Sequence, residues 1–147
     1  MKILQICSVR DFGGGERHVA DLANALTERG HEVFAVVNPH ARLIGELSSL
    51  SAKNVFDVRM RGAADLVGAE KIAGIVRENS VDIIHAHAAR DYPLAAIASR
   101  RSGRPFVLTR HVLFPMRRLH KVLLGNASRV IAVSNAVAPH AQVRKCR

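Results

Sequence analysis

Short apolar runs alternate with segments of helical period along most of this chain, and this alternation limits the folds that it can adopt. Continuous apolar runs typical of buried strands occur at 2–8, 33–37, 55–58, 82–87, 106–109 and 130–134. The intervening spacing predicts helices that begin at Glu16, near 43, behind Asp65, at Pro93 and near 113. We therefore predict a Rossmann-like α/β fold: a doubly wound parallel sheet with helices on both faces, in three α/β/α layers.

The composition bounds the class of protein. With 147 residues, 48% hydrophobic and 23% charged, the chain is expected to form one globular domain with a buried core. No segment is typical of a signal peptide, and no uncharged apolar run is long enough to cross a bilayer. Cys7 and Cys146 have no metal-ligand spacing, so we expect a cytoplasmic protein without a disulfide framework.

The net charge of +10 lies almost entirely in the second part of the chain. Residues 1–91 hold 11 Lys and Arg against 12 Asp and Glu, whereas residues 92–147 hold 11 Lys and Arg and no acidic residue. The two parts therefore carry net charges of −1 and +11. This asymmetry favours an anionic partner, either phosphate groups, a membrane surface or nucleic acid. The alternative is a solvated basic face that only aids solubility.

A glycine-rich turn follows the first predicted strand. Gly13, Gly14 and Gly15 lie between that strand and a helix expected to start near Glu16. Because glycine has no side chain, a ligand can approach this backbone closely and a positive φ costs little. The N–H groups and the positive dipole end of the following helix point at the same turn, which is a typical phosphate site. The alternative is a tight turn with no ligand.

The predicted topology brings this turn close to a second polar segment. If the strands follow the common order 3-2-1-4-5-6, the chain direction reverses between the first and fourth strands, and ligands bind at the carboxyl ends there. The loops beside that crevice are residues 13–16 and the segment that begins at His87. This coincidence is the main sequence evidence for a functional site.

Histidines mark the fourth predicted strand. His85 and His87 are two residues apart, so both side chains face one side of the sheet. No third ligand or carboxylate is evident nearby, and we therefore expect no metal. We interpret His85 as a core histidine with a hydrogen-bond partner and His87 as the functional candidate. His111 is a second candidate, and Arg110 is either part of the site or a solvated side chain.

Two common nucleotide-binding patterns do not fit. A dinucleotide fingerprint requires Gly-x-Gly-x-x-Gly and an acidic residue that ends the second strand. Here Arg17 or His18 stands in place of the third glycine, and Asn38 ends the second strand. The P-loop pattern is absent from the sequence.

Six short motifs follow one another along the chain. They are Gly-Gly-x-Glu-Arg-x-Val from Gly13, Leu-Ala-x-x-Leu from Leu22, Arg-Gly-His-Glu-Val from Arg29, Asp-Ile-Ile-His-Ala-His from Asp82, Thr-Arg-His from Thr109 and Val-Ser-Asn from Val133. Together they resemble the motifs of family 4 glycosyltransferases of the GT-B fold. Each motif is loose alone, but their order and spacing over nearly all of residues 1–137 make the resemblance specific.

The resemblance implies a retaining transferase that moves a sugar from a nucleotide-sugar donor to a saccharide or lipid-linked acceptor without a metal or other cofactor. Cell-envelope polysaccharide or lipopolysaccharide biosynthesis is the implied setting. By position it assigns donor-phosphate binding to Gly13, Gly14 and Gly15, catalysis at the reacting sugar to His87, and acceptor or sugar binding to Glu16, Arg110 and His111.

The resemblance also implies a domain division. We expect a Rossmann-like, acceptor-side domain over 1–138 and a polar, basic tail over 139–147. In the family, a second Rossmann-like domain binds the sugar nucleotide, and this sequence contains no such domain. The chain is therefore expected to be inactive alone and to need a C-terminal domain or a separate subunit.

A basic amphipathic helix is predicted over 113–125, with Arg117, Arg118 and Lys121 opposite an apolar stripe. It either covers the sheet or attracts anionic lipid, which would place the protein at the inner face of the membrane. Nucleic-acid binding is disfavoured because no aromatic residues interleave with the basic ones. A non-catalytic sugar or nucleotide binder ranks ahead of it.

Overall fold

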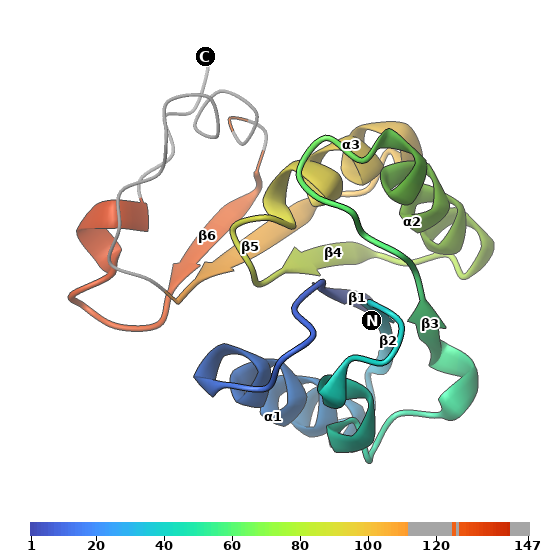
Figure 1. Cartoon of the computed structure of the whole chain (residues 1–147), viewed down its shortest axis with the longest axis horizontal. Coiled ribbons are helices and arrows are strands. Elements are labelled where there is room, and N and C mark those ends of the chain that lie inside the picture. The colour runs from blue at the N-terminus through green and yellow to red at the C-terminus, as the bar shows by residue number, and fades with distance from the viewer. Residues whose placement is uncertain (112–124, 126, 142–147) are drawn as a thin grey trace.

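The computed structural model, which describes residues 1–111, 125 and 127–141, contains a six-stranded parallel sheet (Figure 1). The strands are β1 (Lys2–Cys7), β2 (Glu32–Val37), β3 (Val55–Asp57), β4 (Ile83–Ala86), β5 (Phe106–Arg110) and β6 (Arg129–Ala132). Their spatial order is β3-β2-β1-β4-β5-β6. This is the common doubly wound order, so the predicted fold class is confirmed.

Helices cover both faces of the sheet. Helix α1 (Gly14–Glu28) lies on one face, and α2 (Leu66–Glu78) and α3 (Tyr92–Ser102) lie on the other (Figure 1). Side chains of a strand point alternately to the two faces, so each strand contributes to two separate cores. Leu4 and Ile6 of β1 belong to the α2–α3 core, and Cys7 belongs to the α1 core.

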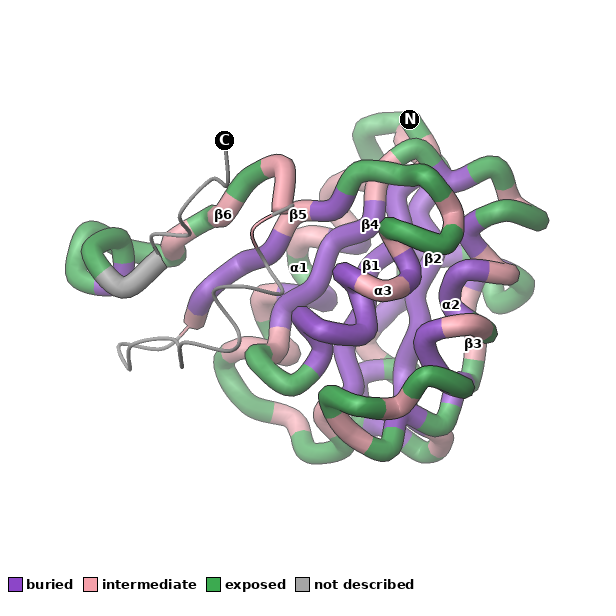
Figure 2. Tube along the Cα trace, turned by 90° about the horizontal axis from the view of Figure 1, so that it is seen from above, coloured by how far each residue is buried: buried purple, intermediate pink, exposed green. Residues whose placement is uncertain are grey.

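Burial is deepest in the middle of the sheet. Residues of β1, β2 and β4 are mostly buried, whereas β6 alternates between exposed and half-buried residues (Figure 2). This pattern follows from the topology, because β6 is an edge strand and the described helices pack on the central strands. The most deeply buried part of the sheet therefore lies around the junction of β1 and β4.

The helices start and end where their local sequence predicts. The Asp65 side chain caps α2 by accepting the Gly68 N–H at 2.9 Å. Gly30 follows α1 with φ of 82°, and Gly103 ends α3 with φ of 72°, a left-handed conformation in which glycine is favoured. Pro93 lies in the first turn of α3, where its missing N–H costs no hydrogen bond.

The segment at 43–50 differs from its prediction. It contains a short 3₁₀ helix, Arg42–Glu46, instead of a helix through residue 50. Asn24 of α1 donates to the Glu46 carbonyl oxygen at 2.9 Å and accepts the Ser49 N–H at 3.1 Å. These bonds use backbone groups that a longer helix would pair internally, so the helix ends early. Two further 3₁₀ segments, Ala52–Asn54 and Ala138–Ala141, were not predicted.

Two sequence predictions cannot be placed on this structure. Most of the basic helix expected over 113–125, including Arg117, Arg118 and Lys121, lies outside the described residues, as does the tail from 142. Within the described part of the chain, no helix has the length and apolar character needed to cross a membrane.

Buried hydrogen bonds at Ser8 join the carboxyl ends of three strands to α3. The Ser8 N–H donates to Asp91 Oδ2 at 2.9 Å, and the Ser8 carbonyl oxygen accepts from the Asn38 side-chain amide. Asn38 Oδ1 in turn accepts the Met60 N–H at 2.8 Å. Because Ser8, Asn38 and Asp91 are buried, these bonds satisfy groups that water cannot reach. The loops after β1, β2 and β3 are thereby held in a fixed arrangement.

Within this network, burial makes the ionised form of the Asp91 carboxyl group less favourable. Asp91 is fully buried beside Ser8, and burial raises the pKa of its carboxyl group from 3.8 to about 6, although the hydrogen bonds from Ser8 oppose the shift. Between these two pKa values the folded state binds more protons than the unfolded state. The free energy of unfolding therefore falls as the pH rises through this window, and the loss is complete above pH 6.

We predict that Asp91→Asn removes this pH dependence. A shift of about 2 pKa units corresponds to about 3 kcal/mol, so the parent should lose about that much stability relative to the variant between pH 4 and 7. Urea denaturation of both proteins at several pH values measures this difference. A difference that stays constant with pH would show that the carboxyl group titrates normally in the folded protein.

Candidate functional site

A cavity of about 340 Å³ opens at the carboxyl edge of the sheet, where β1 and β4 lie side by side. Its wall includes Cys7, Gly15, Glu16, His87, Tyr92 and His111. These residues come from the end of β1, the start of α1, the segment after β4, the start of α3 and the end of β5. The cavity therefore lies at the topological switch point that the sequence predicts.

The glycine turn is part of helix α1. Gly13 is the N-cap with φ of −139°, and Gly14 and Gly15 form the first helical turn. None of the three has a positive φ, so the conformational freedom of glycine is not needed here. Apart from its chain neighbours and the backbone of its own helix, a Cβ atom at Gly14 or Gly15 would meet no atom of the described residues within 4 Å. Folding alone does not explain two glycines at these positions, and their effect is to leave the helix N-terminus uncovered.

Glu16 holds this turn in place. Its Oε2 accepts the Gly13 N–H at 3.0 Å, which is the reciprocal bond of a capping box. The N–H groups of Gly14, Gly15 and Glu16 belong to the first helical turn and have no intrahelical acceptor. These N–H groups supply hydrogen-bond donors at the positive end of the helix dipole. Gly15 and Glu16 line the cavity, so this end of the helix forms part of its wall.

His87 follows β4 and is held by a neighbouring strand. Its Nε2 lies 2.6 Å from Gln5 Oε1 of β1, and its side chain is 4% exposed. Because an amide oxygen only accepts, Nε2 carries the proton and Nδ1 keeps a lone pair. Nδ1 is buried and has no hydrogen-bond partner among the described residues. His87 is therefore an oriented group with an unused acceptor in the cavity wall.

His85 has the structural role that the sequence predicts. Its Nε2 lies 2.7 Å from Thr109 Oγ1, and its ring centroid is 4.1 Å from that of His87. Burial lowers the pKa of His85 to about 4. The prediction of a core histidine with a hydrogen-bond partner is confirmed, and His85 is absent from the cavity wall.

The fold adds His18 and His111 to His87. The His18 ring centroid lies 6.0 Å from that of His87 and 5.0 Å from that of His111. Sequence analysis missed His18, although its place three residues after Gly15 puts both on one side of α1. One ring nitrogen of each of these three histidines lies within 4.8 Å of the other two. Among the described residues, these histidines therefore form a group that could hold a metal ion. The expectation that no metal takes part stays a prediction.

Burial sets the charge state of the cavity. It lowers the pKa of His87 well below 6.5, and the neighbouring His85 and His111 lower it further. Burial also lowers the pKa of His111. Neutral imidazoles each offer one N–H donor and one lone pair, which suits hydrogen bonds to uncharged hydroxyl groups. Burial raises the pKa of Cys7 to about 12, so its thiol is not an ionised nucleophile.

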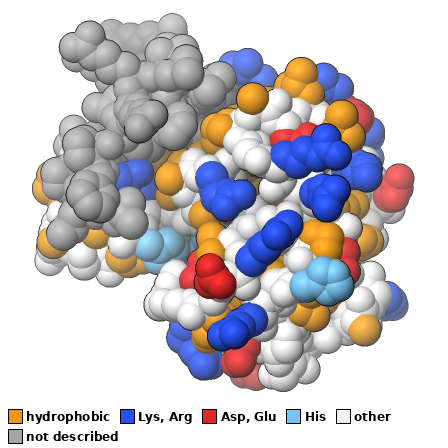
Figure 3. All heavy atoms as spheres, in the orientation of Figure 1, with side chains coloured by type: hydrophobic (Ala, Val, Ile, Leu, Met, Phe, Trp, Pro, Cys, Tyr) orange, Lys and Arg blue, Asp and Glu red, His pale blue; other side chains and the backbone are white. Residues whose placement is uncertain are grey.

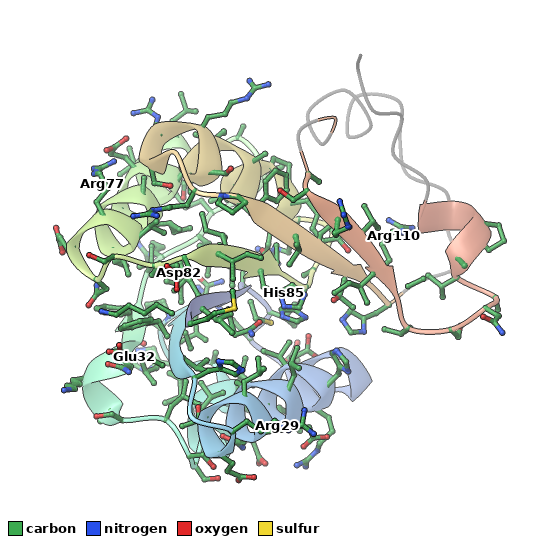
Figure 4. The ribbon with its side chains drawn as sticks, turned by 180° about the vertical axis from the view of Figure 1, so that it is seen from behind. Arg29, Glu32, Arg77, Asp82, His85 and Arg110 are labelled. Atoms are coloured by element: carbon green, nitrogen blue, oxygen red, sulfur yellow. The ribbon has the colours of Figure 1, made fainter. Side chains whose placement is uncertain are left out.

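Arg110 lies away from these groups. Successive side chains of a strand point to opposite faces, so Arg110 points to the face opposite to that of Thr109 and His111. Its side chain lies on the α3 side of the sheet, whereas that of His85 lies on the α1 side (Figure 4). Arg110 is 2% exposed and does not line the cavity. Its assignment to acceptor or sugar binding stays a prediction, and the structure brings together only Gly15, Glu16, His87 and His111.

Solved structures with this fold include glycosyltransferases. Anabaena Alr3699/HepE, solved in complex with UDP and glucose, matches with a TM-score of 0.75 and 23% identity over 95% of this chain and 40% of that chain. A glycosyltransferase from Rickettsia africae ESF-5 matches with a TM-score of 0.77 and 23% identity over 95% of this chain and 38% of that chain. The apo form of WaaB, a lipopolysaccharide outer core galactosyltransferase, matches with a TM-score of 0.68 and 18% identity over 100% of this chain and 43% of that chain.

These similarities establish the fold, and the family comes from the sequence. The chain spans about two fifths of the length of these structures. No curated protein matches it by sequence. The family model described as Glycosyltransferase Family 4 matches residues 12–144, which confirms the resemblance drawn from the motifs. The chain belongs to Glycosyltransferase Family 4.

Proposed function

We propose that this chain forms the acceptor-side half of a retaining glycosyltransferase that moves a sugar from a nucleotide-sugar donor to a saccharide or lipid-linked acceptor. The observation that carries the proposal is the pairing of an uncovered helix N-terminus with a neutral, oriented His87 across one cavity. The first group suits the donor diphosphate, and the second suits the hydroxyl groups of the reacting sugar. The solved structure of Alr3699/HepE with UDP and glucose supports a nucleotide-sugar donor.

In this proposal the glycine turn stabilises the diphosphate as it leaves the sugar. Charge develops on the leaving phosphate oxygen in the transition state, and backbone N–H groups fixed by the Glu16 cap need no reorganisation to meet it. Gly14 and Gly15 let the phosphate reach these groups because no side chain shields them. No metal is required for this step, since the helix dipole and the N–H donors supply the positive potential.

His87 acts at the sugar through a hydrogen bond rather than a charge. Its pKa lies well below neutrality, and Gln5 fixes the ring with Nδ1 as the acceptor. A lone pair at a fixed position can orient a sugar hydroxyl or carry its proton as bonds change at the anomeric carbon. Glu16 and His111 line the same cavity and are proposed to bind the acceptor or the sugar.

We predict that this chain by itself catalyses no multiple turnover, because the donor nucleotide is proposed to bind mainly to a second domain. UDP-glucose and other sugar nucleotides are incubated with the chain and with saccharide or lipid-linked acceptors, and released nucleotide is measured. The same chain joined to a donor-binding domain is the positive control. Turnover by the isolated chain would contradict the division of labour. A two-domain protein that binds but never transfers would identify a non-catalytic binder.

We predict that Gly14→Val weakens nucleotide binding without unfolding the protein. The backbone at Gly14 is helical and the added Cβ has free space, so the fold should tolerate the change. The branched side chain covers the N–H groups, and the loss of one bond to a charged group should weaken binding about 10-fold or more. Titration of the two-domain protein with UDP measures the effect.

The matched control is Gly74→Val in α2, where an added Cβ meets only Glu78 Oε1 at 3.8 Å. Thermal unfolding of both variants excludes a general loss of structure. If Gly14→Val is folded and binds UDP like the parent, the glycine turn is not the phosphate site and serves only as the start of the helix.

We predict that His87→Ala lowers kcat by about 10²-fold or more with a smaller change in KM, as expected for a group that acts on the reacting sugar in the transition state. His87→Gln preserves some hydrogen-bonding capacity toward Gln5 and should be folded if the alanine variant is not. His31→Ala, at a partly exposed histidine outside the cavity, should leave kcat unchanged. Unaltered turnover in a folded His87 variant would remove this residue from the mechanism.

A further inference from the structure

A second hollow, of about 530 Å³, opens at the same edge of the sheet on the side of β2 and β3. Its wall contains Arg10 from the loop after β1, Arg59 and Arg61 from the loop after β3, and Arg90 from the loop after β4. Figure 3 shows Lys and Arg side chains gathered around the middle of this face. Segments that are far apart in the sequence thus direct arginines to one place.

The two hollows are neighbours. Cys7 lines the first cavity and Ser8 lines the second, while Ala89 lines the first and Arg90 lines the second. The walls of the two hollows therefore adjoin at two places along the chain, Cys7–Ser8 and Ala89–Arg90. Both hollows thus lie along the carboxyl edge of the sheet, on neighbouring parts of the same two loops.

The charge of the second hollow is strongly positive. Four arginines and one acidic residue, Asp11, line it, which gives a net charge of +3. None of these four guanidinium groups forms an ion pair within 4.0 Å with a carboxylate in the described residues, whose pairs involve other basic side chains. Like charges that converge without paired acids repel one another, and an anion between them relieves that repulsion.

The backbone beneath the arginines is fixed, as a binding site requires. The Val58 N–H donates to the Val37 carbonyl oxygen at 2.9 Å, and the Met60 N–H donates to Asn38 Oδ1 at 2.8 Å. The Arg61 N–H donates to Asp65 Oδ2 at 3.0 Å. The loop that carries Arg59 and Arg61 is therefore held along its length, and binding an anion would order only the side chains.

We propose that this arginine-lined hollow binds a phosphate or diphosphate group carried by the sugar acceptor. Arginine forms paired, charge-assisted hydrogen bonds to phosphate oxygens, and several converging guanidinium groups match a group of two or more negative charges. Identification of the anion's carrier as the acceptor rests on the proposed function, whereas the anion site itself does not. The hollow is distinct from the glycine turn, which is proposed to hold the donor diphosphate in the neighbouring cavity.

The first test is calorimetric titration of the whole chain with inorganic pyrophosphate. Arg59→Gln/Arg61→Gln should weaken binding at least 10-fold, because two guanidinium groups are lost from the site. Arg29→Gln/Arg104→Gln removes the same charge at the amino edge of the sheet and should change binding less than 2-fold, given that the direct contacts dominate. In Gly14→Val, the pyrophosphate binding that depends on Arg59 and Arg61 should persist, whatever additional binding the glycine turn contributes in the parent chain.

Three results would overturn the site. They are no binding by the parent chain, an equal loss in the two double variants, and a loss caused by Gly14→Val rather than by the arginine variants. The last result would place pyrophosphate at the glycine turn. None of these measurements involves transfer, so failure of the anion site is distinguishable from failure of the proposed function.

A second test asks what carries the anion. In an active two-domain protein, Arg59→Gln/Arg61→Gln should raise KM at least 10-fold for a phosphorylated acceptor and leave KM for its unphosphorylated counterpart unchanged. A soluble sugar phosphate and a polyprenyl diphosphate sugar in phosphatidylcholine vesicles are compared to separate a free from a lipid-linked source. An equal rise in KM for both forms of the acceptor would show that the arginines do not recognise its phosphate.

Discussion

The hydrogen bonds of the Ser8 backbone are the interactions on which the carboxyl edge of this sheet depends. Ser8 joins β1 to the start of α3 through Asp91 and to the end of β2 through Asn38, and Asn38 continues the connection to Met60 after β3. In a parallel sheet the carboxyl ends of the strands would otherwise be linked only through separate loops. With buried partners on every side, these loops have a defined relative position, and both hollows are built on them.

The two sides of the first cavity use different physical properties. The helix N-terminus offers a positive potential through backbone groups whose charge does not change with pH. The histidines opposite it are kept neutral by burial and by one another, so they offer hydrogen bonds instead of charge. These properties support the proposal that a phosphate binds on one side and a neutral sugar on the other. This difference in polarity would orient a sugar phosphate in a single direction across the cavity.

The second hollow places positive charge beside the first cavity. The walls of the two hollows adjoin at Cys7–Ser8 and at Ala89–Arg90, but four of the residues that line the second hollow are arginines. All four arginines belong to residues 1–91, whose net charge is −1, while every acidic residue of that part except Asp11 lies outside the wall of this hollow. A sum of charge along the sequence therefore gave no sign of this hollow, because the sum does not record which side chains converge.

From the amino-acid sequence alone, the six strands, the ends of α1, α2 and α3 and the doubly wound fold class could be predicted, since they follow from local periodicity, from glycine and capping residues and from the rules of parallel connections. The sequence also predicted that Gly15, His87 and His111 lie near one another, because the carboxyl ends of β1, β4 and β5 meet at one edge of the sheet. Only the tertiary structure placed Gly14 and Gly15 inside a helix, added His18, directed Arg110 to the other face and gathered Arg10, Arg59, Arg61 and Arg90. These outcomes depend on burial and on contacts between distant segments, and no local pattern encodes either of them.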